Sequence, residues 1–457
     1  MTATDDHRRV RPFRPGGYDR GAEPALPPGP RWPALVQSLA LLRFRHLFVP
    51  AMHRRFGEVF TIRLPPQGQP LVLFTRPAHI KEIFAGDPEV FQAGKGNAIL
   101  APVMGEHSVL LQDGAGHQRA RRLLMPAFNG ATLHGYDALV TRLAQEEVAR
   151  WRPGAAFRAL DRMNAVTLEV VLRVVFGVTD ESRLAALRPL VNRIIDVSPV
   201  LLLGWGHPLV RRLGPWRRAA ADQAALDTLL YAEISERRTA PDLASRQDVL
   251  SRLLNVGGDQ PLTDAELRDQ LVTLLLAGHE TTATALAWAL HELGRDPVQL
   301  SRAQAAADTD DRDRLEAVMK ESMRLHPVIP MVVRHLVRPA TVGGIALPQG
   351  ANVAPSILLT HARGDLHPDP EAFRPERFLE SEVASATWIP FGGGVRRCLG
   401  AGFSLMEGVA VLREVLLHHD VSVPPGPVER PKVRNITSVP RHGARVVVRP
   451  RAGAVSG

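Results

Sequence analysis

The stretch Phe391-Gly-Gly-Gly-Val-Arg-Arg-Cys-Leu-Gly400 contains Cys398, the only cysteine among 457 residues. Its three glycines predict a loop in which backbone N–H groups approach a single atom closely. A helix is predicted to begin at Gly402, so we expect the loop and the helix N-terminus to lower the pKa of the thiol. Lone cysteines are usually inert members of a core. This loop instead indicates a metal-binding thiolate. Since the chain has no second cysteine, we expect the metal to bring its other ligands with it.

Composition narrows the class of protein. Apolar residues make up 45% of the chain and charged residues 23%, which is enough apolar sequence for a large core. One cysteine excludes intrachain disulfides and multi-cysteine zinc or iron–sulfur sites. The net charge is +9, but the arginines are scattered, often beside acids, and there are only three tyrosines. This pattern argues against a nucleic-acid-binding protein.

The chain is predicted to form one domain, residues 25–457, after a polar and basic flexible tail, residues 1–24. No apolar stretch reaches the roughly 18 residues of a membrane span, and the N-terminus lacks the apolar core of a signal peptide. Residues 34–42 predict an amphipathic helix, since basic residues follow them at once. We expect a cytoplasmic protein without a membrane span.

Apolar spacing predicts a helical middle with short strands towards both ends. Val59–Leu64 and Leu71–Thr75 predict a β-hairpin. Helical spacing is clearest in four segments: Asp137–Arg150, Asn164–Val175, Arg217–Arg237 and Leu243–Leu254. Later β-like runs, a helix and a last strand are predicted at Met331–Val337, Thr341–Leu347, Ala351–Leu359, Gly402–His418 and Ala444–Val448. The fold class is mainly α with a smaller β portion (α+β).

A long helix is predicted over Leu267–Leu293, preceded by the capping box Thr263/Glu266. It is roughly 45 Å long at 1.5 Å per residue, and its middle is apolar nearly all round, which predicts burial on every side. The polar stretch Ala277–Thr282 interrupts it, although a mid-helix glycine costs about 1 kcal/mol and an unpaired buried carboxylate several. We interpret this stretch as a site, with the Thr281 hydroxyl bonding the Ala277 carbonyl and opening the helix ladder. The alternative is a kinked core helix with a satisfied glutamate.

The cysteine loop resembles that of the cytochrome P450 family of haem-thiolate monooxygenases, because Phe391, Gly394, Arg396 and Gly400 stand at that family's spacing from Cys398. Three more family motifs appear in order: Ala277–Thr282, Glu321-Ser-Met-Arg324 and Phe373-Arg-Pro-Glu-Arg-Phe378. The resemblance, to soluble bacterial members, implies a single triangular helix-rich fold with a long central distal helix. A local departure, His361-Ala-Arg-Gly364, leaves only that loop in doubt.

The resemblance also implies a set of site residues. Cys398 would bind haem b as the axial thiolate, within a loop that includes Phe391, Gly392 and Gly400. The cations for the haem propionates would be His117, Arg121, Arg334 and Arg396; for His117 and Arg121 the alternative is a solvated basic helix face. Thr281 and Glu280 would relay protons for oxygen activation, beside Ala277 and Gly278. Glu321, Arg324 and Arg377 would form a buried structural ion triad.

The implied activity is hydroxylation or epoxidation of a lipophilic molecule (terpenoid, fatty acid, steroid or polyketide) by a monomeric enzyme of bacterial secondary metabolism. O₂ is the oxidant, and a ferredoxin with an NAD(P)H-dependent reductase supplies two electrons, docking near Arg396 and Arg397. The family's substrate-lining segments correspond to Phe91–Met104, Val197–Trp205, Val328–Val332 and Ile436–Val439. The alternatives are a peroxide-driven haem-thiolate peroxygenase and a non-catalytic haem- or lipophile-binding protein.

Overall fold

The computed structural model describes residues 26–65, 67–178, 180–195, 210–255, 261–380, 383–384 and 386–451. The predicted tail, residues 1–24, lies outside the described residues, as does the predicted substrate-lining segment 197–205. The single domain over residues 25–457 stays a prediction.

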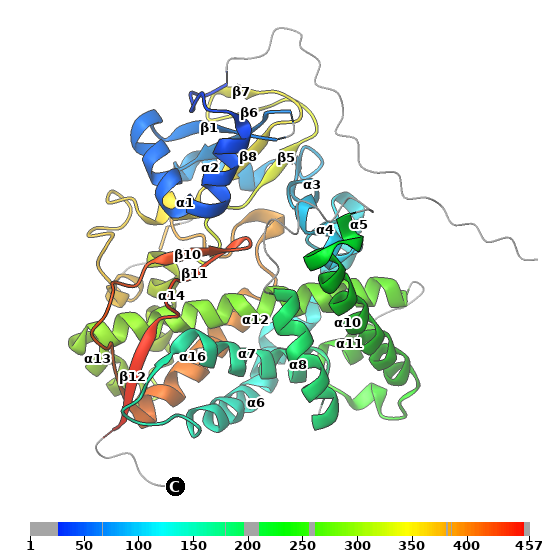
Figure 1. Ribbon diagram of the computed structural model, residues 1–457, viewed down its shortest axis with the longest axis vertical. Helices are drawn as coiled ribbons and strands as arrows, with labels where there is room; N and C mark the ends of the chain where they lie inside the picture. The colour runs from blue at the N-terminus through cyan, green and yellow to red at the C-terminus, as the bar shows by residue number, and fades with distance from the viewer. Residues whose placement is uncertain are drawn as a thin grey trace, which may run out of the picture.

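Helices dominate the molecule, and α12 crosses its middle (Figure 1). The α-helices of the described chain are α1 (Ala34–Phe56), α2 (Pro77–Ala85), α3 (Ala93–Gly96), α4 (Ala101–Met104), α5 (Gly114–Leu124), α6 (Gly130–Val148), α7 (Ala159–Val175), α8 (Glu181–Ile195), α10 (Gly214–Thr239), α11 (Val249–Asn255), α12 (Asp264–Arg295), α13 (Pro297–Asp308), α14 (Arg312–Leu325), α15 (Ile357–His361) and α16 (Ala401–His418). α12 packs on α7, α14 and α16, and these helices supply most of the largest apolar core. None of the described helices is both long and apolar enough to cross a membrane.

The strands form small sheets. One of them lies under α1, away from α12 (Figure 1), and another, near the C-terminal end, packs on α12 and contributes residues to the same apolar core. They are β1 (Val59–Leu64), β2 (Gln69–Phe74), β3 (Phe91–Gln92), β4 (Ala156–Arg158), β5 (Arg334–Leu336), β6 (Ala340–Val342), β7 (Ile345–Leu347), β8 (Asn352–Pro355), β9 (His419–Ser422), β10 (Pro431–Arg434), β11 (Thr437–Pro440) and β12 (Arg445–Pro450). The order β1-β2-β8-β5-β3 makes the largest sheet, and the order β4-β12-β9 makes a second. The predicted hairpin is confirmed as the antiparallel pair β1–β2, and β10–β11 is a separate hairpin.

Three segments differ from the sequence-based expectation. The β-like run Ala351–Leu359 is a strand only at β8, and its last residues begin helix α15, where the Ser356 hydroxyl accepts the N–H of Leu359 at 3.4 Å. The helix predicted over Leu243–Leu254 is interrupted, because the Asp248 side chain accepts the N–H of Ser251 at 2.9 Å and so begins α11 anew. The run Thr341–Leu347 is two strands, β6 and β7. Gly343 and Gly344 have φ of 57° and 77°, which suit the tight turn of a two-residue hairpin.

The ends of α12 agree with the capping signals in the sequence. The Thr263 side chain accepts the N–H of Glu266 at 3.2 Å, and the Glu266 carboxylate accepts the N–H of Thr263 at 2.9 Å. The helix then runs unbroken for 32 residues to Arg295. It therefore passes continuously through the polar stretch 277–282.

Candidate active site

The cysteine loop is closed by hydrogen bonds and packs tightly against α2. The N–H of Cys398 donates to the carbonyl of Phe391 at 2.9 Å. Gly392 and Gly394 have φ of 65° and 64°, a region that glycine adopts without steric cost. A Cβ on Gly394 would lie only 2.0 Å from the carbonyl oxygen of Phe84. The loop therefore needs glycine at 394 both for its conformation and for its approach to α2.

The Cys398 side chain is accessible, although protein atoms surround it. The residue is exposed, yet burial raises the pKa of its thiol, against the opposing effects of the Gly400 N–H, Arg121 and Arg397. A residue that lines an accessible recess within a protein has both properties. The expected lowering of the pKa is wrong for the protein alone, because lost hydration outweighs the nearby N–H groups and cations. A metal cation would reverse that balance, since ligation deprotonates a thiol.

Four basic side chains from three segments converge beside this loop. They are His117 and Arg121 on α5, Arg334 on β5 and Arg396 in the loop itself. Burial, followed by the charges of Arg396 and Arg121, lowers the pKa of His117 to about 4. Arg334 is 6% exposed, and burial lowers the pKa of its guanidinium to about 10. His117 is thus neutral at physiological pH, and the three arginines carry the positive charge.

Arg334 shows what kind of group this cluster fits. Its hydrogen bond goes to the carbonyl of Val333 at 3.0 Å, and none of the described carboxylates lies within ion-pair distance of it. A buried cation without a carboxylate is unfavourable. A Cβ on Gly400, in the same loop as Cys398, would meet no atom of the described residues within 4 Å apart from its neighbours in the chain. The set of donors fits haem, whose propionates would pair with the arginines and whose iron would bind the sulfur.

The carboxylate of Asp113 neutralises Arg396, one of the four basic side chains. This role of Asp113 was not predicted from the sequence. Arg396 forms an ion pair with Asp113 and donates to the carbonyl of Gln112 at 2.6 Å. Asp113 also accepts the N–H of Gly94 at 2.8 Å. The Arg396 side chain is only 10% exposed, whereas Arg397 is exposed, so Arg397 is the more accessible of the two arginines, and docking of an electron carrier near them stays a prediction. The only sequence signal for Asp113 is its place directly before α5.

One stripe of α12 is accessible, where the sequence predicts burial on every side. Leu274, Gly278 and Thr281 are partly exposed and Ala277 is exposed, although most of the helix around them is buried. These positions are spaced i, i+3, i+4 and i+7, so they share one face. Thr281 donates to the Ala277 carbonyl at 2.7 Å, as expected. The helix stays intact, so the predicted opening of its ladder is wrong, and the stripe itself offers the room for a small molecule.

Glu280, next to Thr281, is buried and paired. It is 5% exposed, and its Oε1 lies 3.4 Å from Nε of Arg434 on β10. The hydroxyl of Thr437 on β11 donates to the same oxygen at 3.4 Å. The sequence predicted a buried carboxylate that needs a partner but not the partners themselves, because Thr437 is 157 residues away and no spacing rule links the two.

α12 is also joined to the helix that follows the cysteine loop. The hydroxyl oxygens of Thr282 and of Ser404 on α16 are 3.0 Å apart. Further along α16, Glu407 is completely buried, and no hydrogen bond of standard geometry from a described residue reaches its carboxyl oxygens. Burial raises the pKa of Glu407 to about 8, and the Thr282 hydroxyl offsets part of that rise. Glu407 is therefore mostly neutral at pH 7. Sequence reasoning missed it.

The structure brings together the three residues predicted to form an ion triad. Arg324 donates to both carboxylate oxygens of Glu321, at 2.7 and 2.8 Å, and Nε of Arg377 donates to Glu321 at 3.0 Å. Glu321 and Arg324 are 0% and 1% exposed. Arg324 also donates to the carbonyl of His361 at 3.1 Å, so the local sequence departure at residues 361–364 leaves the triad intact.

A family model described as cytochrome P450 matches residues 27–447 of the chain. The chain belongs to the cytochrome P450 family. Among its relatives, this P450 is 52% identical to cytochrome P450 135A1 of Mycobacterium tuberculosis over 429 residues, which covers 93% of this chain and 96% of that protein. It is 42% identical to cytochrome P450 135B1 of Mycobacterium bovis over 432 residues, covering 93% and 91%.

Solved structures of P450s have the same fold. A retinoic-acid-bound cyanobacterial CYP120A1 superposes with a TM-score of 0.83 at 26% identity, covering 94% of this chain and 100% of that one. The haem domain of cytochrome P450DA superposes with a TM-score of 0.80 at 24% identity, covering 94% and 99%. The predicted mainly α fold with small sheets is confirmed.

Membership in the cytochrome P450 family establishes the cofactor and the class of reaction. This P450 is a monooxygenase and binds haem through a cysteine thiolate. Cys398 supplies that thiolate, because it is the chain's one cysteine.

Proposed function

We propose that this P450 hydroxylates or epoxidises a lipophilic small molecule, with O₂ as oxidant and two electrons from a ferredoxin that an NAD(P)H-dependent reductase keeps reduced. For hydroxylation, the substrate, O₂, two electrons and two protons give the alcohol and water. The observation that carries the proposal is the accessible stripe on α12, where Thr281 lies beside the buried and paired Glu280.

Haem bound through Cys398 supplies the redox chemistry and activates O₂. The side chains on α12 manage protons around it. The Thr281 hydroxyl now donates to Ala277, so its oxygen can still accept a hydrogen bond, and a rotation about χ1 would let it donate to a ligand on the stripe. Glu280 is the adjacent acid. Its ion pair with Arg434 and the hydrogen bond from Thr437 orient its carboxylate when no proton is being transferred.

The four basic side chains near Cys398 and the ion triad have supporting roles in this proposal. His117, Arg121, Arg334 and Arg396 would hold the haem propionates. The triad fixes the segment around Arg377, which precedes the cysteine loop, by joining it to α14. Both roles orient the sulfur and the haem without touching substrate.

Apolar lining supports a lipophilic substrate. The described segments proposed to face it are Phe91–Met104, Val328–Val332 and Ile436–Val439, in which acids are absent. The cyanobacterial P450 of similar fold is named with retinoic acid bound. Retinoic acid, a long-chain fatty acid and a steroid are therefore the first probes to use, and Arg397 is the exposed cation nearest Cys398 in sequence for an acidic ferredoxin.

The test compares two sources of oxidant with each probe that shifts the haem absorption spectrum. Product formed with ferredoxin, reductase and NADPH, together with substrate-dependent O₂ uptake, supports the proposal. Product formed as fast with hydrogen peroxide alone would favour a peroxygenase. Probes that bind but never stimulate O₂ uptake would favour a non-catalytic binding protein.

A further inference from the structure

The first half of α1 is polar on its buried side and apolar on its exposed side. Gln37, Ser38 and Arg45 are 0%, 7% and 7% exposed. Large apolar side chains in and just before the helix are instead in solvent: Trp32 (49% exposed), Leu35 (63%), Val36 (46%), Leu39 (55%), Phe44 (53%) and Leu47 (62%). A surface helix of a globular protein normally has the opposite arrangement. Single exposed apolar residues are ordinary, but six within residues 32–47 form a patch that calls for a partner.

Specific hydrogen bonds fix this orientation. The Gln37 amide donates to the carbonyls of Pro30 and Trp32, at 3.1 and 2.7 Å, and accepts the N–H of Arg63 at 2.8 Å. The guanidinium of Arg45 donates to two carbonyls at the turn of the β10–β11 hairpin, those of residues 435 and 436, at 2.5 and 2.9 Å. Rolling the helix to bury its leucines would break all of these bonds. The apolar patch is therefore a fixed feature of the fold.

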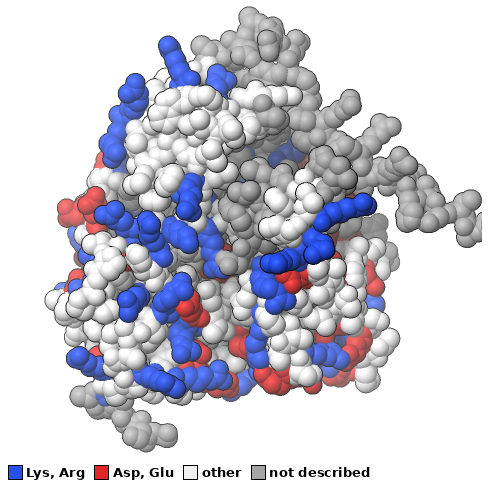
Figure 2. Space-filling view, in the orientation of Figure 1, with Lys and Arg blue, Asp and Glu red and all other residues white. Residues whose placement is uncertain are grey.

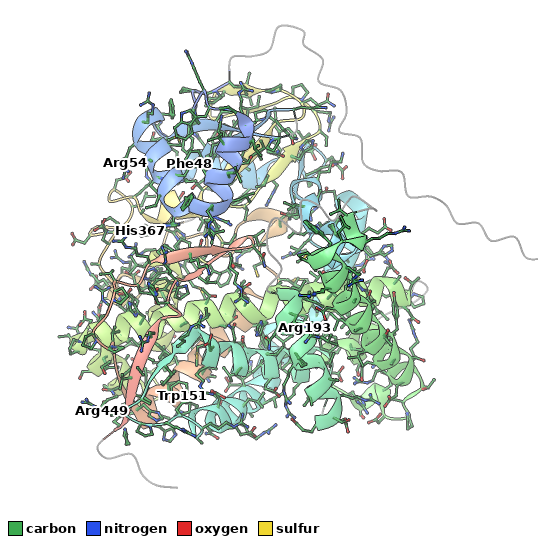
Figure 3. The ribbon with its side chains drawn as sticks, viewed as in Figure 1. Phe48, Arg54, Trp151, Arg193, His367 and Arg449 are labelled. Atoms are coloured by element: carbon green, nitrogen blue, oxygen red, sulfur yellow. The ribbon has the colours of Figure 1, made fainter. Side chains whose placement is uncertain are left out.

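The charge carried by α1 and the residues just before it has one sign. No acidic residue occurs between residues 26 and 57. Arg31, Arg43, Arg54 and Arg55 are exposed, and none of the ion pairs among the described residues involves them. Figure 2 shows a mostly white surface over α1 with basic side chains at its margins, and Figure 3 shows Arg54 at the outer edge of the molecule. Phe48, by contrast, is only 7% exposed.

This combination fits one kind of partner. A second copy of the chain would bring the same arginines together, which like-charge repulsion disfavours. An anionic bilayer surface offers phosphates to the arginines and, a few ångströms deeper, an apolar layer to the leucines. An interfacial helix of this kind lies on a membrane and does not span it.

We propose that α1 binds the surface of anionic lipid bilayers, with the patch defined by Trp32, Leu35, Val36, Leu39, Phe44 and Leu47 at the boundary between headgroups and acyl chains. Arg31, Arg43, Arg54 and Arg55 contact lipid phosphates. The proposal concerns a surface remote from Cys398 in sequence and is independent of the substrate assigned above.

Co-sedimentation of the full-length, haem-loaded protein with vesicles tests it. The probes are vesicles of phosphatidylcholine with phosphatidylglycerol and vesicles of phosphatidylcholine alone. The wild type is expected to prefer the anionic vesicles and to dissociate as salt is raised. Leu35→Gln with Leu39→Gln should lower binding by at least about tenfold, and Arg54→Gln with Arg55→Gln by roughly tenfold on anionic vesicles. The matched control is Val298→Gln on α13, whose side chain is 59% exposed; it should bind like the wild type.

The affected side chains are exposed, so unchanged circular dichroism and unfolding temperature will show that the variants fold. Failure of the wild type to bind anionic vesicles would overturn the proposal, as would equal binding by the leucine variant. A concentration-dependent dimer that only the leucine variant dissociates, without vesicle binding, would assign the patch to a second copy instead.

Discussion

Arg434 on β10 holds the carboxylate of Glu280 on α12, with 3.4 Å between Nε and Oε1. The two side chains are 25% and 7% exposed, so the pair is largely shielded from water. Arg45 of α1 in turn holds the turn of the same hairpin through two backbone carbonyls. An acid next to Thr281 is thus positioned by a hairpin near the C-terminal end, and that hairpin is positioned by the first helix.

Removing Arg434 should take away from the buried Glu280 the guanidinium that lies 3.4 Å from its Oε1. We expect Arg434→Gln to lower the free energy of unfolding by about 1–2 kcal/mol, between the values for surface and buried ion pairs. In a double-mutant cycle with Glu280→Gln, thermal or urea unfolding should give a coupling of about 1 kcal/mol. Lys432→Gln, an exposed change on the same strand, is the control. Additive effects of the two substitutions would show that the pair contributes nothing.

Thr281→Ala should separate electron consumption from oxygenation. The variant keeps the helix, because only the side-chain bond to Ala277 is lost, but it removes the hydroxyl that we place in proton delivery. We expect NADPH and O₂ to be consumed while the product formed per O₂ falls by about tenfold or more. Thr281→Ser, which keeps the hydroxyl, should retain most of the coupling. Equal coupling in the alanine variant and the wild type would remove Thr281 from the relay.

Local signals in the sequence predicted local structure well. The Thr263/Glu266 capping box, the β1–β2 hairpin and the glycine-rich loop at Cys398 each depend on residues a few positions apart. Interactions between distant segments left no such signal, and neither the Glu280–Arg434 pair nor the Arg396–Asp113 pair was predicted. The interrupted helix at residues 243–254 has the same origin, because Asp248 also pairs with Arg237, at 2.7 Å, on another helix.

The pattern of apolar residues in the sequence also could not distinguish a helix face that is buried in the core from one that is accessible inside the protein. The stripe at Leu274 and Ala277 is as apolar as a buried face, because lipophilic ligands and protein cores both favour apolar residues. In the first half of α1 the opposite case occurs, because polar residues are buried there and apolar residues are exposed. Its polar Gln37 and Arg45 are buried because backbone carbonyls of other segments satisfy them, which no periodicity reveals.

Glu407 should make stability fall with rising pH. Burial raises its pKa from 4.5 to about 8 in the folded protein, so between these values the folded state holds a proton that the unfolded chain has released. The free energy of unfolding then decreases by up to about 1.4 kcal/mol per pH unit across this window and levels off above it. Glu407→Gln removes the titration. The variant should gain stability relative to the wild type between pH 5 and pH 8, measured by urea unfolding; parallel pH curves would contradict a raised pKa.

Arg334 should affect the haem-free and haem-bound proteins in opposite directions. Its buried charge lacks a carboxylate among the described residues, so Arg334→Met should stabilise the haem-free protein. The same change removes a propionate partner, so transfer of haem to apomyoglobin should become about tenfold faster. Arg338→Met is the control, because that side chain is 64% exposed. Destabilisation of the haem-free variant, or unchanged haem transfer, would contradict the assignment.

Two glycines of the cysteine loop should respond differently to the same added methyl group. Gly394→Ala combines a φ of 64° with a Cβ 2.0 Å from the Phe84 carbonyl, so it should lower the free energy of unfolding by at least about 2 kcal/mol with or without haem. Gly400 has a φ of −87° and open space around its Cβ position. Gly400→Ala should therefore leave the haem-free protein within about 1 kcal/mol of the wild type and reduce haem retention, because the methyl group enters the space that we assign to the porphyrin. Unfolding of both forms, with haem content after gel filtration, measures these effects. Full haem retention by Gly400→Ala would place the porphyrin elsewhere than beside this residue.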